Sequence, residues 1–295
     1  MIEAALAETI GLSMIKRGDS VYLKVNTNSG DSFPFSTSPT CIATIGGMLR
    51  DMGVTDIRIG DRSFWGDDDT AANFERNGIA QAARKLGTRA IAFEDEGTDW
   101  VILPRDLHPD WVGELRLPRL VTSATHIINL PCLKTHFIAG FTMSLKNCLG
   151  LVNPTDRRRP GNLKTHAPID EALGRQIAQV NQAFTPSLNV LNGYRALITG
   201  GPTPHDRTHH RGGDIATPRV VIASTDRIAT DATGLAVLRT LCPKTESVTQ
   251  FAPFAHPQLK AAILAGLGIA SPAACDLSGA SVPELERYLK ELRAV

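Results

Sequence analysis

Short apolar segments alternate with helical patterns over the first third of the chain, and this alternation restricts the fold more than any other feature. The segments 20–25, 56–60 and 90–93 have the length and composition of strands. The stretches between them, 38–53 and 70–86, have helical spacing and end at or next to glycine. Elements in this order are typical of an open, mostly parallel, Rossmann-like α/β sheet with helices on both faces.

Polar residues follow each of these strands, namely Asn26, Asp61 and Glu94. Ligands of open α/β sheets bind outside the carboxyl ends of the strands, so we expect these side chains to border a binding site. A fourth strand, 125–129, leads directly into segment 129–151. That segment places charged residues in an otherwise apolar background.

The remaining chain continues the same pattern with longer insertions. No internal repeat and no linker is visible, which favours a single α/β unit spanning residues 1–295. Loops are expected at 27–39, 62–69, 96–120, 152–168 and 199–214, helices at 2–15, 168–184, 226–241, 257–267 and 282–293, and strands at 188–191 and 219–223.

Composition excludes several classes of protein. The chain has 295 residues with 42% hydrophobic and 21% charged residues, which is typical of globular proteins and not of disordered ones. The net charge of +1 gives no general attraction to nucleic acid or to a membrane surface. The first residues lack the features of a signal peptide and no apolar run reaches membrane-spanning length, so we expect a cytoplasmic protein. The five cysteines form no CxxC pair, which excludes a self-contained iron–sulfur motif.

The two lysines of segment 129–151 are the first candidates for chemistry. If 142–150 is a helix, Lys146 and Asn147 share one side of it, and Gly150 allows a close backbone approach. Two ammonium groups, from Lys134 and Lys146, would suit a carboxylate or phosphate ligand. The alternative is that both lysines are solvated surface residues, as most lysines are.

A metal site is the second candidate. Asp231 falls on the apolar side of its expected helix, where a carboxylate requires a cation, a metal or backbone donors. Together with His136 and His166, either Asp231 or Asp226 would complete a two-histidine, one-carboxylate site, with iron as the first choice. No short ligand motif such as HExxH supports this grouping, and a structural hydrogen bond would explain Asp231 equally well.

Other polar clusters carry weaker signals. The basic run 157–159 contains Arg157 and Arg158, which would either bind an anion in bidentate fashion or form a solvated turn. The three histidines within 205–210 are expected to be exposed to solvent. Neither GxGxxG nor a P-loop is present, so the sequence contains no nicotinamide or P-loop nucleotide signature.

Several short motifs are spread along the chain: Lys24-Val25-Asn26, Leu130-Pro131, Lys134-Thr135-His136, Thr142 to Asn147 with Gly150, His166, Gly201-Pro202, and Ser224-Thr225-Asp226 with Ala229 and Asp231. In these motifs the chain resembles the DUF362 family, a group of uncharacterised bacterial and archaeal proteins, from about residue 10 to residue 240. The family often looks like an α/β domain fused to a ferredoxin-type iron–sulfur module, which implies redox work. This sequence has no CxxCxxC run, so electron transfer would need an external electron donor or another cofactor.

Three functions follow from these patterns. The first is a metal-dependent oxidoreductase acting on a small anionic substrate; the second is a metal-free lyase or isomerase using Lys146 or Lys134; the third is a non-catalytic ligand-binding or partner subunit. We expect no nucleic-acid or membrane partner and allow for a homo-oligomer. The expected site residues are Lys146, His136 and Asp231 for catalysis, Asn26, Lys134, Asn147, Arg157 and Arg158 for the substrate, and His136, His166 and Asp231 for the metal.

Overall fold

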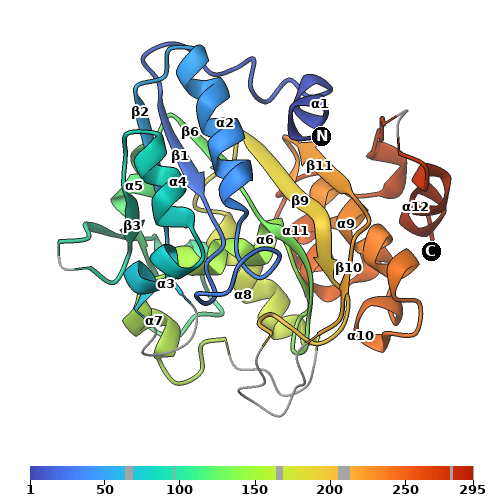
Figure 1. Cartoon of the computed structure of the whole chain (residues 1–295). Helices are drawn as coiled ribbons and strands as arrows, with labels where there is room; N and C mark the ends of the chain where they lie inside the picture. Colours follow the sequence, from blue (N-terminus) through green and yellow to red (C-terminus); the bar gives the residue numbers. More distant parts are fainter. Residues whose placement is uncertain (64–68, 96, 164–168, 205–212, 280–281, 295) are drawn as a thin grey trace.

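The computed structural model describes residues 1–63, 69–95, 97–163, 169–204, 213–279 and 282–294 (Figure 1). Within these residues nine strands form one mixed sheet: β1 (Ser20–Lys24), β2 (Asp56–Asp61), β3 (Ala90–Ala92), β6 (His126–Asn129), β7 (Cys132–His136), β8 (Gly140–Thr142), β9 (Leu188–Leu197), β10 (Ile215–Ala216) and β11 (Val220–Ser224). The strand order is β3-β2-β1-β6-β9-β7-β8, and β10 and β11 pair with β9. The first five strands of this order are parallel to one another, as is β7 to β9, whereas β8, β10 and β11 are antiparallel to their partners. The expected open, mostly parallel α/β fold is confirmed.

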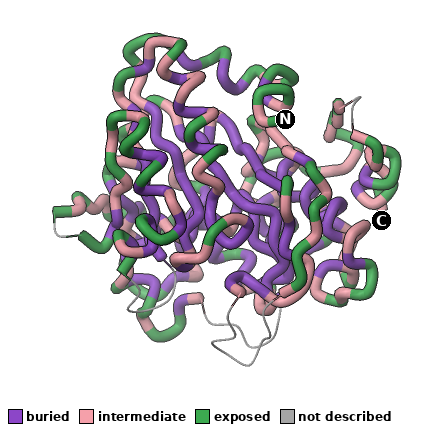
Figure 2. The backbone as a smooth tube through the Cα atoms, viewed as in Figure 1, coloured by how far each residue is buried: buried purple, intermediate pink, exposed green. Residues whose placement is uncertain are grey.

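Helices cover both faces of the sheet, and the alternation of side chains along β1 decides which core each residue joins. Val21 and Leu23 pack into one apolar cluster, and Tyr22 packs into the other. Figure 2 shows the central strands as almost continuously buried. The first cluster lies under α1 (Ile2–Ala7), α2 (Pro39–Asp51), α3 (Thr70–Arg76) and α4 (Ile79–Lys85); the second lies under α8 (Glu171–Asn181), α9 (Arg227–Leu241), α10 (Glu246–Thr249), α11 (Pro257–Leu264) and α12 (Leu285–Leu292).

Strands β6 and β7 follow one another along the same side of β9. Ile128 pairs with Leu188, and four residues later Cys132 pairs with Asn192. Since β1 stops opposite Asn129, β7 and β8 extend beyond the carboxyl ends of β1 and β2. This extension forms a wall beside the edge where ligands of such sheets bind.

Segment 142–150 is not one helix, so that prediction was wrong. Gly140–Thr142 forms β8, a short helix α6 spans Ser144–Asn147, and a 3-10 turn covers Cys148–Leu151. The helix begins at Ser144 because the carboxylate of Asp231 accepts the N–H groups of Ser144 and Leu145.

The expected helix over 70–86 is also interrupted. It is divided into α3 and α4 at Gly78, which adopts φ +84°. The Asn77 side chain next to it donates to the carbonyl of Ser29 and accepts from Ile79 N–H, and these local bonds compete with the helix.

Several expected boundaries change in smaller ways. The helix over 2–15 ends at Ala7, and the strand over 188–191 continues to Leu197. The expected loop at 96–120 contains a separate antiparallel pair, and that at 152–168 contains a helix. These additional elements are β4 (Trp100–Ile102), β5 (Arg116–Pro118), α5 (Arg119–Ser123) and α7 (Pro154–Arg158). Among the described residues, no helix has the length and apolar character needed to cross a membrane.

Candidate functional site

The candidate site lies at the carboxyl ends of β1 and β6. The chain builds β2 and β3 on one side of β1 and then places β6 on the other side. This boundary is the topological switch point at which open α/β sheets bind ligands. Lys24 ends β1 and its register partner Asn129 ends β6, while Asp61 ends β2.

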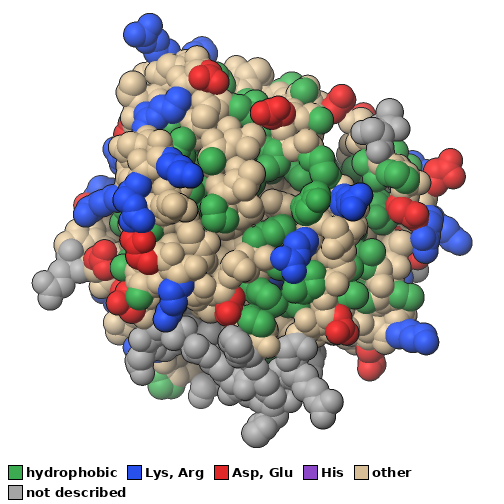
Figure 3. Space-filling model, in the orientation of Figure 1, with side chains coloured by type: hydrophobic (Ala, Val, Ile, Leu, Met, Phe, Trp, Pro, Cys, Tyr) green, Lys and Arg blue, Asp and Glu red, His purple; other side chains and the backbone are tan. Residues whose placement is uncertain are grey.

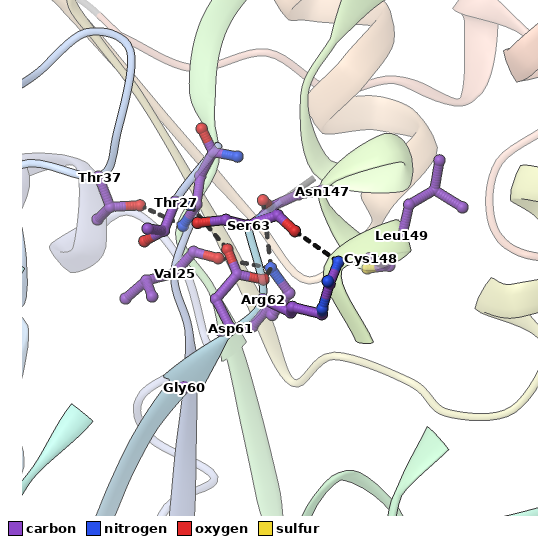
Figure 4. A network of polar contacts seen from close by, with 12 residues as sticks. Val25, Thr27, Thr37, Gly60, Asp61, Arg62, Ser63, Asn147, Cys148 and Leu149 are labelled. Carbon is purple, nitrogen blue, oxygen red and sulfur yellow. Dashed lines mark hydrogen bonds and ion pairs between the residues drawn. The ribbon is translucent and has the colours of Figure 1, made fainter. Parts of the chain in front are cut away.

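A buried ion pair joins β1 and β2 at this edge. Lys24 Nζ lies 2.8 Å from Asp61 Oδ1, and the other Asp61 oxygen accepts the N–H of Thr27 at 2.7 Å. Figure 4 shows Asp61 beside Thr27 at the end of β2. The backbone of Gly150 approaches the pair closely, because a Cβ at this position would lie 2.0 Å from Asp61 Oδ1.

Lys134 holds its ammonium group inside the protein on neutral acceptors. Its Nζ donates to Asn26 Oδ1 at 2.6 Å and to the carbonyl of Phe35 at 2.7 Å, and the residue is 1% exposed. Among the described residues no carboxylate forms an ion pair with it. Burial lowers the pKa of Lys134 to about 8. An ammonium in this environment would gain much from an anion, because charge-assisted bonds are roughly twice as strong as neutral ones.

Lys146 lies close enough to Lys134 and Arg157 for their charges to act on it. Burial of its ammonium, followed by the charges of Lys134 and Arg157, lowers the pKa of Lys146 to about 7. Lys146 nevertheless keeps partial access to solvent. A lysine with this pKa is about half deprotonated at neutral pH and can accept a proton there.

The two arginines of the basic run separate in space. Arg157 is buried and donates to the carbonyls of Leu149 (3.2 Å) and Ser63 (2.9 Å). Burial and then the charge of Arg62 lower the pKa of Arg157 to about 9. Arg158 is exposed and faces a different part of the surface. The site thus contains only one of the two arginines expected to bind substrate.

His136 follows Lys134 on β7 and is buried. Its Nδ1 accepts the N–H groups of Ile138 (3.1 Å) and Ala139 (3.3 Å). Burial and then the charges of Lys146 and Lys134 shift the pKa of His136 well below its ordinary value, so the ring is neutral. Since Nδ1 acts as an acceptor, the proton of the neutral ring must be on Nε2. His136 is therefore a hydrogen-bond donor through Nε2.

Asp231 holds the start of α6. Its two oxygens accept Ser144 N–H (2.7 Å) and Leu145 N–H (2.9 Å), so the carboxylate fixes the helix turn that carries Lys146. Burial raises the pKa of Asp231 to about 7, against the lowering effect of these two backbone donors. A cation, a metal and backbone donors were the partners considered for Asp231, and the structure shows backbone donors.

Asn147, one residue further, is bonded at both ends of its amide. Its Oδ1 lies 3.3 Å from Lys24 Nζ, and its Nδ2 donates to Asn129 Oδ1 at 2.8 Å. Asn147 therefore connects α6 to the ends of β1 and β6.

The donor set does not favour the predicted metal site. Among the described residues, no group of three or more His, Cys, Asp and Glu side chains is arranged to hold a metal ion. Both Asp231 oxygens are taken by backbone donors, and a metal at His136 Nε2 would have to displace the only proton of a neutral ring. His166 and the histidines of 205–210 lie outside the described residues.

A separate cavity of about 710 Å³ opens beside the ends of β2 and β3. Both acidic and basic side chains line it, but neither Lys134 nor Lys146 does. Its lining includes Arg62, Asp69, Glu94, Asp95, Trp100 and Arg158.

Comparison with known proteins found a family and a relative. A family model described as a domain of unknown function, DUF362, matches residues 21–236, which is more than half of the chain. The chain belongs to the DUF362 family. It is also similar to the thylakoid-associated protein sll1697 of Synechocystis sp., with 27% identity over 203 residues that cover 66% of this chain and 57% of that protein. The chain thus spans a little over half the length of this relative.

The DUF362 site brings together most of the side chains selected from the sequence. Asn26 and Lys134 are in direct contact, and the charges of Lys134 and Arg157 act on Lys146. Sequence reasoning assigned no site role to Lys24, although a lysine within a buried strand was a usable signal.

Proposed function

We propose that this DUF362 protein is a cytoplasmic lyase or isomerase that acts on a small anionic substrate without requiring a metal. The observation that supports this most is the buried ammonium of Lys134, which is bonded to two neutral oxygens. A carboxylate or phosphate group of the substrate would supply the negative charge that this ammonium lacks in its contacts.

Lys146 then acts as the general base. In its neutral form it removes a proton from the carbon next to a substrate carbonyl, and the electron pair moves onto the carbonyl oxygen. The Nε2–H of His136 donates a hydrogen bond to this oxyanion. In an isomerase the substrate carries a hydroxyl on the deprotonated carbon: the Lys146 ammonium returns the proton to the former carbonyl carbon, and the hydroxyl proton moves to the oxyanion as the new carbonyl forms. In a lyase the ammonium gives its proton to a group that departs from the carbon on the other side of the deprotonated carbon.

Two measurements test this proposal. Thermal-shift titrations with phosphate, pyruvate and oxaloacetate should show stabilisation of the wild type and a much weaker effect on Lys134→Met. Deuterium exchange at the substrate carbon, followed by proton NMR in D2O, should require Lys146 and be lost in Lys146→Met. Lys260→Met, at an exposed position of α11, is the matched control. If Lys134→Met responds to all three anions as the wild type does, the anion site is not at Lys134.

The function of an iron-dependent oxidoreductase stays a prediction, and it can be tested directly. Protein purified without chelator would be analysed for bound metal, and His136→Ala and His166→Ala would be compared with the wild type. Stoichiometric iron that is lost in both variants would favour that function over the proposed one.

The partner-subunit alternative has one supporting observation. The matched part covers 57% of the cyanobacterial relative, so that protein has additional sequence outside it. A stable complex with a second protein, together with anion binding but no exchange at any substrate carbon, would favour this alternative.

A further inference from the structure

The turn between β7 and β8 is held by a side chain from the C-terminal part of the chain. Gln258, at the start of α11, is 2% exposed. Its Nε2 donates to the carbonyls of Ala139 (2.6 Å) and Phe141 (3.1 Å). The orientation of this amide is fixed by its partners, because the opposite orientation would place its oxygen against two carbonyl oxygens.

The same turn determines the state of His136. Ala139 is shared between the two contacts, since its carbonyl accepts from Gln258 and its N–H donates to His136 Nδ1. A displacement of Ala139 would remove one of the two N–H donors of Nδ1 and weaken the preference for the ring proton on Nε2. Gln258 and His136 are thus connected through one residue.

Packing on the C-terminal side leaves the turn little room to move. Gly140 has φ +76°, and a Cβ there would lie 2.6 Å from the carbonyl oxygen of Ser247 and 2.7 Å from His256 Nε2. The His256 ring packs against Phe141 with ring centroids 4.6 Å apart. The turn is therefore enclosed by α10 and the start of α11.

We propose that Gln258 is a positioning residue that keeps His136 in the tautomer with its proton on Nε2. The proposal rests on the proposed function for the role of His136 toward the substrate, but the tautomer itself can be observed without any ligand. Gln258 lies beyond residues 21–236, the part that the family model matches. The C-terminal segment therefore takes part in the candidate site without contributing a ligand-contacting group.

Nitrogen NMR of histidine-labelled protein tests the positioning role directly. In the wild type, His136 should show an unprotonated Nδ1 and a protonated Nε2 at pH 7.5. In Gln258→Leu the two nitrogens should move toward averaged shifts, and deuterium exchange at the carbon next to the carbonyl of pyruvate should slow about fivefold, the equivalent of one neutral hydrogen bond to the oxyanion. Lys260→Met, on the same helix, should leave both readouts unchanged. A folded Gln258→Leu variant with the wild-type His136 spectrum would overturn the proposal.

The positioning role of Gln258 and the proposed function of His136 are contradicted by different results. A changed tautomer with unchanged deuterium exchange of pyruvate would support the positioning role and contradict the part of the proposed function that assigns His136 to the oxyanion. The wild-type protein gives a further test that does not depend on any variant folding. Both Gln258 side-chain amide protons should be protected from exchange with solvent, and rapid exchange would contradict the proposal.

Discussion

In the folded chain the pKa of Lys134 is about 8, lowered mainly by burial from an ordinary value of 10.5. Between these values the unfolded chain binds more protons than the folded chain. The contribution of Lys134 to stability is therefore fully present above about pH 10.5 and is lost as the pH falls toward 8. Burial disfavours the charged form of Lys134, and a bound anion would favour it. We therefore expect an anion to bind at Lys134.

Replacing Lys134 by methionine should remove this pH dependence. The difference in unfolding free energy between wild type and Lys134→Met should change by up to about 1.4 kcal/mol per pH unit between pH 8 and 9.5. Urea unfolding at four pH values measures it, with Lys260→Met as the control. Parallel curves for wild type and Lys134→Met would show that Lys134 titrates normally.

Adding one Cβ atom at Gly150 tests how closely the backbone approaches the buried Lys24–Asp61 ion pair. Gly150→Ala places a Cβ 2.0 Å from Asp61 Oδ1, and we expect a loss of about 1–3 kcal/mol from overpacking. Gly47→Ala is the matched control, since a Cβ there has no atom within 4 Å and the position is within α2. That variant should gain about 0.5–1 kcal/mol from its helix propensity. Equal melting temperatures for the two variants would contradict the close approach.

At the scale of elements, α6 depends on a carboxylate from another helix. Asp231→Asn would turn an N–H group toward the backbone donors of Ser144 and Leu145, and we expect a cost of about 1–3 kcal/mol for the unsatisfied donor. Burial raises the pKa of Asp231 from its ordinary value of 3.8 to about 7. The contribution of this pKa shift to stability is therefore greatest below pH 3.8 and is lost as the pH rises toward 7. The stability of Asp231→Asn relative to the wild type should therefore improve from pH 5 to pH 7.5. A pH-independent difference in urea unfolding would refute this assignment.

Periodicity predicted the elements whose own residues determine them. The strand over 20–25 and the helix over 38–53 differ from β1 and α2 by one or two residues, because burial and flanking glycine act locally there. The segment 142–150 could not be predicted in this way, because its helix starts where Asp231, 87 residues away from Ser144, supplies an acceptor. The candidate site followed the same rule: Asn26 was expected at a strand end and Lys134 in the segment that leaves the strand at residue 129, whereas the role proposed for Gln258 depends on packing between distant segments.

For the whole molecule, anion binding and folding should be coupled. A ligand that binds only the folded chain stabilises it by about 2.7 kcal/mol at a concentration of 100 times its dissociation constant. Phosphate should thus raise the melting temperature of the wild type more at pH 7 than at pH 9, since Lys134 and Lys146 lose their charge across this range. Calorimetry at both pH values measures this, with chloride at equal ionic strength as control. An equal rise at both values would place the anion elsewhere.

The helix α11 has a practical consequence for exchanging segments between relatives. The match to the family model ends at residue 236, within α9, whereas α12 packs on α9 through Arg239 and Glu291 at 2.8 Å. A graft of 21–236 into another protein would transfer the side chains proposed to face the anion but not the helix whose Gln258 bonds to the turn beside His136. The part that the family model matches and the part proposed to hold the site therefore have different boundaries, and we expect chimeras joined after α12 to keep the turn in place.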